Sequence, residues 1–401
     1  MRMAFSLPWF NLRRDAARRT TRAPHVVAEF DMALVWAALV LLLFGLVMVY
    51  SASITVAEAG KAFHYQSTYF LVRQSIYITL GILCACLAFQ IPSRTWQDLA
   101  PWLFIAGVVL LVLVFVPGIS RPVNGARRWI SLGLVNVQPS EFMKLFAVLY
   151  AADFTARKAF QMHNFRKGLL PLAAVMLPVG VLLLLEPDYG ATFVIFIVAA
   201  GILFIGGMNA KWFVALIAIL AAAFTLLIAV SSYRLNRFLG FMDPWADAFG
   251  KGYQLTHSLI AFGRGEWFGV GLGASIEKHH YLTEAHTDFL LAVIAEELGF
   301  VAVVSLVILF AVLVMRAFVI GRLAVSFERP FASLAAQGIG IWFGLQAFIH
   351  MGVNMGMLPT KGLTLPFMSY GGSGTIANCI ALGILMRIDW ENRQRIRGLP
   401  T

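Results

Sequence analysis

The sequence predicts an all-α fold: a polytopic integral membrane protein with about ten transmembrane helices and one long extracytoplasmic loop. Hydrophobic residues make up 60% of the 401 residues and charged residues 13%. In soluble domains, nearly half of the residues are hydrophobic and about a quarter are charged. The mean hydropathy is +0.80. This composition excludes a disordered chain, a nucleic-acid-binding domain and an ordinary soluble enzyme.

Uninterrupted apolar runs mark the expected spans, because about 20 apolar residues cross a bilayer as a helix. Ten such runs follow one another along the chain. They cover 32–54, 69–90, 100–117, 137–155, 169–185, 190–207, 211–231, 287–315, 331–355 and 371–390.

The distribution of Lys and Arg predicts the orientation of these spans. With both termini in the cytoplasm, the cytoplasmic segments hold 19 Lys and Arg and the extracytoplasmic segments 11, as the positive-inside rule requires. We therefore expect a basic cytoplasmic tail (1–30), one membrane domain (31–390) and a short cytoplasmic tail (391–401). The long extracytoplasmic loop covers about 232–286.

Two charged residues stand inside the fourth expected span. Glu141 and Lys144 are three residues apart, which puts them on one helix face where they can pair. One interpretation is a structural ion pair that neutralises itself in the bundle. The other is a cation that is held by its neighbour and faces an anionic ligand. The spacing leaves both open.

Two outer connections carry further charges. Arg127 and Arg128 follow a short polar turn; they can bind phosphate or be ordinary solvated loop charges. Glu186 and Asp188 flank a proline in the tight connection between two spans. Two carboxylates there can bind a cation or an amine, although acidic turn residues are also common.

Asp288 stands where the chain re-enters the membrane at the eighth expected span. Partial desolvation raises the pKa of such a carboxyl group and suits it to act as a base near neutral pH. The alternative is that Asp288 and Thr287 cap the helix that begins there. Two turns into the same span, Glu296 and Glu297 are expected to be paired in the bundle or to face a watery cavity.

Other polar segments of the outer face give weaker signals. Three His and several carboxylates between 277 and 289 match no zinc spacing. The glycine-rich stretch 263–273 does not match a nucleotide-binding loop. The segment 356–374 contains Lys361 with several Gly and Pro, and such irregular backbone is tolerated at membrane depth where it lines a cavity.

Most candidate groups lie on the predicted outer face, where no nucleotide is supplied. A group-transfer enzyme on that face must receive a donor that is already activated, such as a sugar linked to a lipid diphosphate. The diphosphate leaves readily once Lys, Arg or a metal ion neutralises its charge. A single carboxylate base is then enough to activate the acceptor, a lighter requirement than the acid and base of glycoside hydrolysis.

Seven segments in one order resemble the SEDS family (shape, elongation, division and sporulation) over roughly 30–390. They are NGARRWI at 124–130, QPSEFMK at 138–144, EPDYGAT at 186–192, YQLTHSLIAFGRG at 253–265, EAHTDF at 284–289, EELG at 296–299 and LPTKGLTLPFMSYGGS at 358–373. The run 360–364 resembles the division branch more than the elongation branch. Gly374 departs from the family pattern, in which a second Ser follows Ser373, and we expect this difference to matter little.

The resemblance implies a peptidoglycan glycosyltransferase that polymerises lipid II. Its essential Asp falls on Asp288, which would deprotonate the 4-hydroxyl of the acceptor GlcNAc. That hydroxyl would attack the anomeric carbon of the donor MurNAc with inversion, giving a β-1,4 link and releasing undecaprenyl diphosphate. The candidate substrate-binding residues are Glu141, Lys144, Asp188, Arg127, His286 and Lys361, of which Lys144, Arg127 and Lys361 are candidates for diphosphate contacts.

The resemblance also implies partners and a location. It implies a divalent cation, Mg²⁺ or Mn²⁺, at an unknown site, and no nucleotide cofactor. The partners would be a class B penicillin-binding protein, which is a transpeptidase, and other divisome membrane proteins, with no nucleic acid. The expected location is the bacterial inner membrane at the division septum, with the active site outside.

Two alternatives compete with this enzyme. A flippase for the same lipid would also need charged groups within the membrane, but it should show comparable polar features on both sides. A non-catalytic scaffold of the division machinery would tolerate loss of the Asp288 carboxylate. The clustering of candidates on the outer face favours the enzyme.

Overall fold

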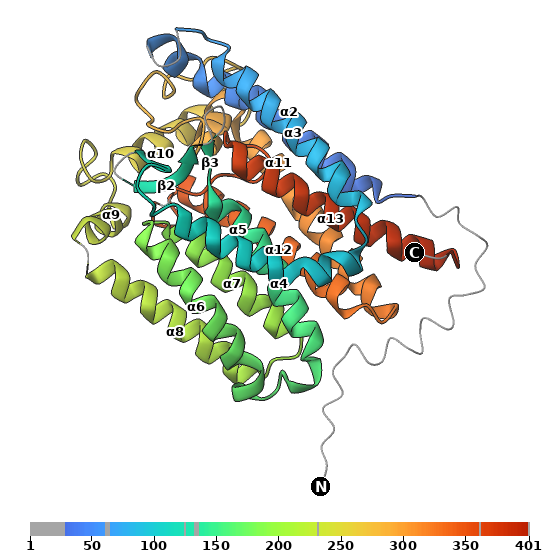
Figure 1. Cartoon of the computed structure of the whole chain (residues 1–401). Coiled ribbons are helices and arrows are strands. Elements are labelled where there is room, and N and C mark those ends of the chain that lie inside the picture. Colours follow the sequence, from blue (N-terminus) through green and yellow to red (C-terminus); the bar gives the residue numbers. More distant parts are fainter. Residues whose placement is uncertain are drawn as a thin grey trace.

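The computed structural model confirms a predominantly helical membrane protein (Figure 1). The structure describes residues 29–60, 65–123, 126–131, 136–230, 232–360 and 362–399. The predicted N-terminal tail therefore lies outside the described residues except for its last two.

Ten helices of 16 or more residues coincide with the ten expected spans within this described part. They are α2 (Met32–Ala59), α3 (Tyr69–Gln90), α4 (Ser93–Leu113), α5 (Pro139–Arg157), α6 (Leu170–Leu185), α7 (Tyr189–Ile205), α8 (Ala210–Ala229), α11 (Leu290–Ser326), α12 (Pro330–Asn354) and α13 (Gly372–Ile396). Seven helical segments among the described residues are long and apolar enough to cross a membrane on their own. The count of ten crossings stays a prediction.

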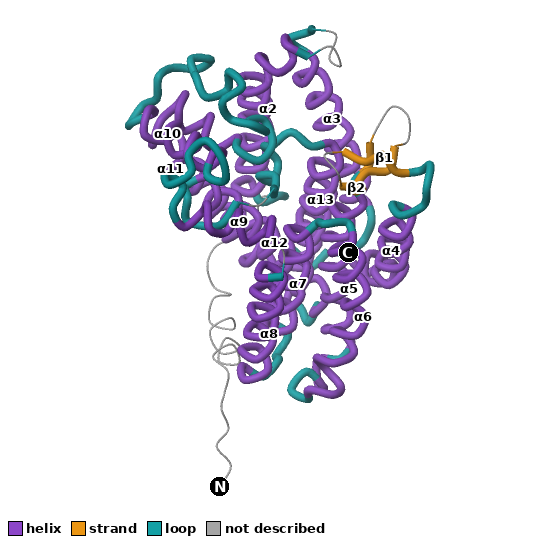
Figure 2. The backbone as a smooth tube through the Cα atoms, turned by 90° about the vertical axis from the view of Figure 1, so that its left-hand side faces the viewer, coloured by secondary structure: helices purple, strands orange, loops and turns teal. Residues whose placement is uncertain are grey.

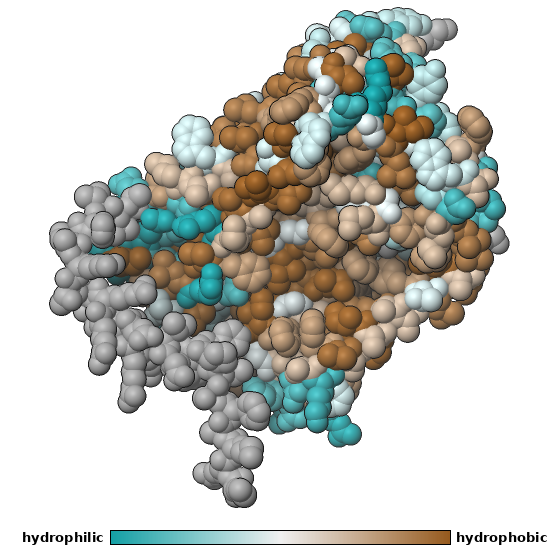
Figure 3. Space-filling model, turned by 180° about the vertical axis from the view of Figure 1, so that it is seen from behind, coloured by the Kyte–Doolittle hydropathy of each residue, from teal (hydrophilic) through white to brown (hydrophobic). Residues whose placement is uncertain are grey.

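The more polar helices lie inside the bundle. Most residues of α5, α12 and α13 are buried, and α5 packs against α4, α7, α12 and α13. By contrast, α8 has no buried residue although it is apolar apart from Lys211 and Thr225. Figure 3 shows apolar side chains over the middle of one face and polar ones toward its ends. A protein exposes so much apolar surface only where lipid or a partner covers it.

Several helices run further than the apolar runs predict. The helix α11 continues to Ser326 rather than 315, and α13 continues to Ile396, so the expected tail 391–401 begins within a helix. Charged residues end an apolar run without ending a helix when they find partners. Arg316, for example, donates from Nε to Asp31 over 2.7 Å.

A small antiparallel sheet was not expected. It consists of β1 (Ser120–Val123), β2 (Ala126–Ser131) and β3 (Asn136–Val137) in the order β1-β2-β3, and Figure 2 shows it at one end of the bundle. The sequence indicates a short polar turn at 124–130, whereas residues from Ala126 onward form β2. Residues 124–125 lie outside the described residues, but an Asn-Gly pair in the sequence between two strands is typical of a hairpin.

The long loop also contains helices: α9 (Ser232–Met242) and α10 (Tyr253–Gly265). Apolar residues recur at helical spacing in 253–262, which agrees with this helix. Leu255 is buried, and α10 packs against α11. Figures 1 and 2 show α10 and the sheet toward the same end of the bundle, which we call the site end.

An ionic network closes the opposite end. The carboxylate of Glu391 on α13 accepts hydrogen bonds from the Ser93 amide over 2.9 Å, from the Ser93 hydroxyl over 2.6 Å and from Arg387 over 2.8 Å. It also pairs with Arg329, which precedes α12. One buried carboxylate thus ties together the first residues of α4, the start of α12 and the end of α13.

Replacing Glu391 with Gln should destabilise the protein, because two arginines then lose their anionic partner. We expect the change to cost about 3 kcal/mol of folding free energy, measured as a lower melting temperature in detergent. Asp98→Asn is the matched control, since Asp98 is exposed on α4. Equal melting temperatures for Glu391→Gln and the control would contradict this role.

Candidate functional site

The pair Glu141–Lys144 is present and buried. Lys144 Nζ lies 2.8 Å from Glu141 Oε1 and also donates to Gln346 Oε1 on α12 over 2.9 Å. It lies 5.6 Å from the ring centre of Trp342, and Lys144 is 1% exposed. Pro139 occupies the first turn of α5, where its missing N–H costs nothing. Through its hydrogen bond to Gln346, Lys144 therefore links α5 to α12 near the site end.

The second carboxylate oxygen of Glu141 faces Gly374. Among the described residues, Oε2 has no hydrogen-bond partner. A Cβ at Gly374 would lie 3.1 Å from it and 3.8 Å from Thr364 Oγ1. The departure from the family pattern at Gly374 therefore lies directly against this carboxylate.

Asp188 joins two helices. It caps α7 by accepting a hydrogen bond from the Ala191 amide over 3.1 Å, as Asp commonly does at a helix N-terminus. Its other oxygen accepts from Ser140 Oγ on α5 over 2.7 Å and from Gln138 Nε2 over 3.4 Å. Asp188 thus holds the first turns of α5 and α7 together.

Glu186, two residues earlier, is buried with both carboxyl oxygens unpaired among the described residues. Burial, and to a smaller extent the nearby charge of Asp188, raise its pKa to about 8 against the lowering effect of Arg128. Arg128 donates to the carbonyls of Glu186 over 3.0 Å and of Pro187 over 2.7 Å. Arg128 thereby holds β2 against the connection 186–188 between α6 and α7, which we call the acidic connection.

Arg127 is exposed on β2, whereas its neighbour Arg128 reaches the acidic connection. Successive side chains of a strand point to opposite faces, so only one of two adjacent arginines can face the connection 186–188 between α6 and α7. Sequence reasoning selected Arg127 because the strand was not foreseen. Recognising the hairpin would have shown that the two arginines have different surroundings.

Asp288 precedes α11 but does not cap it. The capping position is Phe289, with no side-chain hydrogen bond, so the capping interpretation for Asp288 is wrong. The chain makes a tight turn here, and the amides of Thr287, Asp288 and Phe289 all donate to the carbonyl of Glu284. Asn354 on α12 donates to the Asp288 carbonyl over 2.9 Å and so fixes its backbone.

The segment 362–364 brings the acidic groups into one region. A Cβ at Gly362 would lie 2.7 Å from Asp288 Oδ2, so only glycine lets the chain pass so closely. On its other side, the Gly362 carbonyl lies 3.5 Å from the Cβ position of Gly190 in the first turn of α7. Thr364 accepts from Gln346 Nε2 over 2.8 Å through its carbonyl, and Gln346 holds Lys144.

The remaining candidates lie in different surroundings. The His286 ring packs 4.7 Å from Phe70 and 5.6 Å from Tyr370, measured between ring centres. Burial lowers the pKa of His286, against a raising effect of Glu284, so the ring is neutral at pH 7. Lys361 lies outside the described residues. The structure therefore gathers Asp288, Glu141, Lys144 and Asp188 around 362–364, with Arg127 on the adjoining sheet.

The fold and this site define a multi-pass membrane protein with a polar, partly buried site at one end of its bundle. A family model described as a cell cycle protein of the FtsW/RodA/SpoVE type matches residues 32–394. The chain belongs to this family, and the SEDS resemblance is confirmed.

Relatives cover almost the whole chain. A protein of Aromatoleum aromaticum named "Probable peptidoglycan glycosyltransferase FtsW" is 60% identical over 383 residues, 96% of this chain and 93% of the relative. A protein of the same name from Polynucleobacter necessarius is 54% identical, and the match covers 96% of this chain and 92% of the relative.

Solved structures give the same fold. One described as "Structural coordination of polymerization and crosslinking by a peptidoglycan synthase complex" matches with a TM-score of 0.71 at 31% identity, covering 90% of this chain and 98% of that chain. The rod shape determining protein RodA of Thermus thermophilus matches with a TM-score of 0.64 at 30% identity. The match covers 91% of this chain and 97% of that chain.

Gly374→Ser should stabilise the site by offering Glu141 Oε2 a hydroxyl donor. A new buried hydrogen bond is worth about 1 kcal/mol, which we expect as a higher melting temperature. Gly374→Ala adds the Cβ without the donor and is the control. If both variants melt at or below the wild-type temperature, Oε2 gains nothing from a donor at this position.

The buried Glu186 predicts a pH dependence of stability. Its pKa is raised from 4.5 to about 8 in the folded protein, so its contribution is fully present below pH 4.5 and is lost as pH rises through 8. Glu186→Gln stays neutral at every pH. We expect the variant to melt like wild type at pH 5 and at a higher temperature at pH 9. A difference between the two proteins that is the same at both pH values would rule this out.

Proposed function

We propose that this site polymerises lipid II into β-1,4-linked glycan strands and releases undecaprenyl diphosphate. The observation that carries the proposal is the position of the Asp288 carboxylate. It is partly exposed at the site end, next to Gly362, in a region that also holds Glu141, Lys144 and Asp188. The reaction class agrees with the names of relatives that are 54–60% identical.

In this proposal Asp288 is the general base. A carboxylate within hydrogen-bond reach of the acceptor can take the proton of the 4-hydroxyl as it attacks the donor anomeric carbon. The diphosphate then leaves with the bonding electron pair. The backbone of Asp288 is held by Asn354 and by the turn at Glu284, which orients the carboxylate before substrate binds.

The charges around Asp288 suit an anionic donor. Lys144 neutralises Glu141, so the buried pair does not repel a diphosphate. Arg127, which is exposed on the adjoining sheet, is the proposed diphosphate contact, because a guanidinium matches phosphate geometry. Lys361 remains a proposed second contact and His286 a proposed packing group beside the substrate.

A divalent cation fits this site only together with substrate. No group of three or more His, Cys, Asp or Glu in the described part of the chain is placed to hold a metal ion. Mg²⁺, however, is commonly bound by one or two carboxylates plus substrate phosphates. Glu141, whose Oε2 has no partner among the described residues, is the proposed protein ligand. Such a cation would supply charge neutralisation of the diphosphate.

The remaining parts of the proposal concern location and partners. The positive-inside bias of the sequence supports cytoplasmic termini and an extracytoplasmic site. The similarity to the division relatives supports action in the inner membrane at the septum. A class B penicillin-binding protein is the proposed partner, in line with the likeness to a chain of a peptidoglycan synthase complex. Other divisome membrane proteins complete the proposed assembly.

Asp288→Asn should abolish polymerisation while the protein stays folded, because the amide cannot accept the proton. The purified chain with its transpeptidase partner is given lipid II and Mg²⁺ or Mn²⁺, and glycan polymer is measured on a gel. Loss of a general base costs about 100-fold or more in rate. Asp243→Asn, at an exposed residue of the long loop, is the control and should polymerise normally.

Equal polymer from wild type and Asp288→Asn would move the base to another carboxylate of the site. No polymer from either protein, together with lipid II scrambling in liposomes, would replace the polymerase with a flippase.

A further inference from the structure

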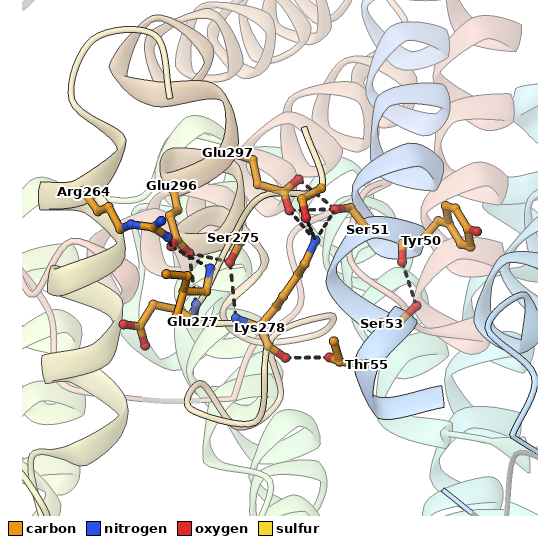
Figure 4. Close-up of polar contacts among 12 residues, drawn as sticks. Tyr50, Ser51, Ser53, Thr55, Arg264, Ser275, Glu277, Lys278, Glu296 and Glu297 are labelled. Carbon is orange, nitrogen blue, oxygen red and sulfur yellow. Dashed lines mark hydrogen bonds and ion pairs between the residues drawn. The ribbon is translucent and has the colours of Figure 1, made fainter. Parts of the chain in front are cut away.

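A second buried polar cluster lies between the long loop, α2 and α11, outside the region around 362–364. Figure 4 shows Lys278 reaching from the loop toward Glu297 of α11 and Ser51 of α2. Lys278 Nζ lies 2.8 Å from Glu297 Oε1 and 3.1 Å from Ser51 Oγ. The side chains of Lys278 and Glu297 are 3% and 0% exposed. The expectation that Glu297 is paired is confirmed.

Further contacts fix the same stretch of loop. Thr55, one turn after Ser51 on α2, donates to the Lys278 carbonyl over 2.6 Å. Glu296 accepts from the Ile276 amide over 2.9 Å and also pairs with Arg264 of α10. Both the side chain and the backbone of Lys278 are therefore bound to elements that are far from it in the sequence.

The loop also crosses α11 at a break in that helix. Gly299 has φ 73°, ψ −171°, which interrupts the helical hydrogen bonds. The loop takes their place: the amides of Val270 and Gly271 donate to the carbonyls of Glu296 and Glu297 over 3.0 Å each. Gly269 passes so close that a Cβ there would lie 2.2 Å from the Glu297 carbonyl oxygen. A broken helix in a membrane protein needs such replacement partners.

These contacts restrict the position of Asp288, because Asp288 belongs to the segment of chain between them. Lys278 and Glu297 are 19 residues apart in the sequence, and Asp288 lies between them. Their ion pair closes the chain into a ring that contains the turn at Glu284 and Asp288. Closing a loop removes many of its alternative conformations. The carbonyl of Glu277, the residue before the ring, accepts from the Leu282 amide within the ring over 2.8 Å, so the order imposed at Lys278 continues toward Asp288.

We propose that Lys278 and Glu297, with Ser51, are positioning residues that hold the ring from 278 to 297 so that Asp288 faces the substrate. They act through the backbone and do not touch the reacting atoms. The proposal rests on the proposed role of Asp288 as the base. It assigns the first turns of α11 and the outer half of α2 a part in the polymerase reaction.

The test compares Lys278→Met with Lys278→Arg in the full chain with its transpeptidase partner. Lys278→Met keeps the length of the side chain and removes its charge, leaving Glu297 buried without a cation. We expect kcat for lipid II polymerisation to fall by about tenfold or more, since small misplacements of a catalytic group have effects of this size. KM should stay within about threefold. Lys278→Arg should recover most of the rate.

A matched control and a second readout separate positioning from general damage. Lys251→Met removes an exposed cation of the same long loop and should leave kcat unchanged. Amide hydrogen exchange reports the order of the ring without reference to activity. It should be faster at 279–289 in Lys278→Met and unchanged in Lys251→Met. The charge exchange Lys278→Glu with Glu297→Lys restores the pair and should slow the exchange again.

Each result decides the proposal. If Lys278→Met keeps the wild-type kcat, or loses activity while exchange at 279–289 stays slow, the positioning role is wrong. If Lys278→Met does not fold, Ser51→Ala removes the hydroxyl that bridges Lys278 and Glu297 and leaves both charges in place. It should lower kcat about threefold, and an unchanged rate would overturn the proposal. Asp288→Asn is assayed in parallel: if it remains active, the base assignment fails, while the exchange data still decide whether the pair orders the ring.

Discussion

No water is present in the bilayer core to solvate a charge or a backbone amide, and this constraint explains most of the polar architecture of the molecule. Several buried carboxylates are paired with a cation, among them Glu141 with Lys144, Glu297 with Lys278 and Glu391 with Arg329. The Arg329–Glu391 pair joins the start of α12 to α13 and the Lys278–Glu297 pair joins the long loop to α11, whereas Glu141 and Lys144 lie on one helix and reach α12 through Gln346. Charges that are costly to bury thereby specify which helices lie together.

The same constraint shapes the irregular backbone near the site. The helix α11 breaks at Gly299, and the loop 266–271 supplies the missing hydrogen bonds. The segment 362–364 runs without helix between Asp288 and α7, with its carbonyls held by α12 side chains such as Gln346. Non-helical chain is thus buried against protein on several sides. This lets backbone and carboxylates approach each other where a continuous helix would keep them apart.

Much of this could be predicted from the sequence. Hydropathy located the helices because each apolar run must form its own backbone hydrogen bonds, and a spacing of three placed Glu141 and Lys144 on one face. The helix ends could not be predicted, because α11 continues through Arg316 only by pairing it with Asp31. The partners of Glu297 and the contact of Arg128 with the acidic connection depend on long-range packing. No local pattern encodes such contacts, and without the strand β2 the two neighbouring arginines look equivalent.

The most direct test of Asp288 as the base is the structure of the complex with its transpeptidase and a lipid II substrate bound as acceptor, with a non-transferable donor analogue beside it. We predict that the 4-hydroxyl of the acceptor lies within hydrogen-bond distance of the Asp288 carboxylate, with the donor diphosphate toward Arg127 and the Glu141–Lys144 pair. An acceptor hydroxyl placed instead against Glu141 or Asp188, with Asp288 facing away, would contradict it.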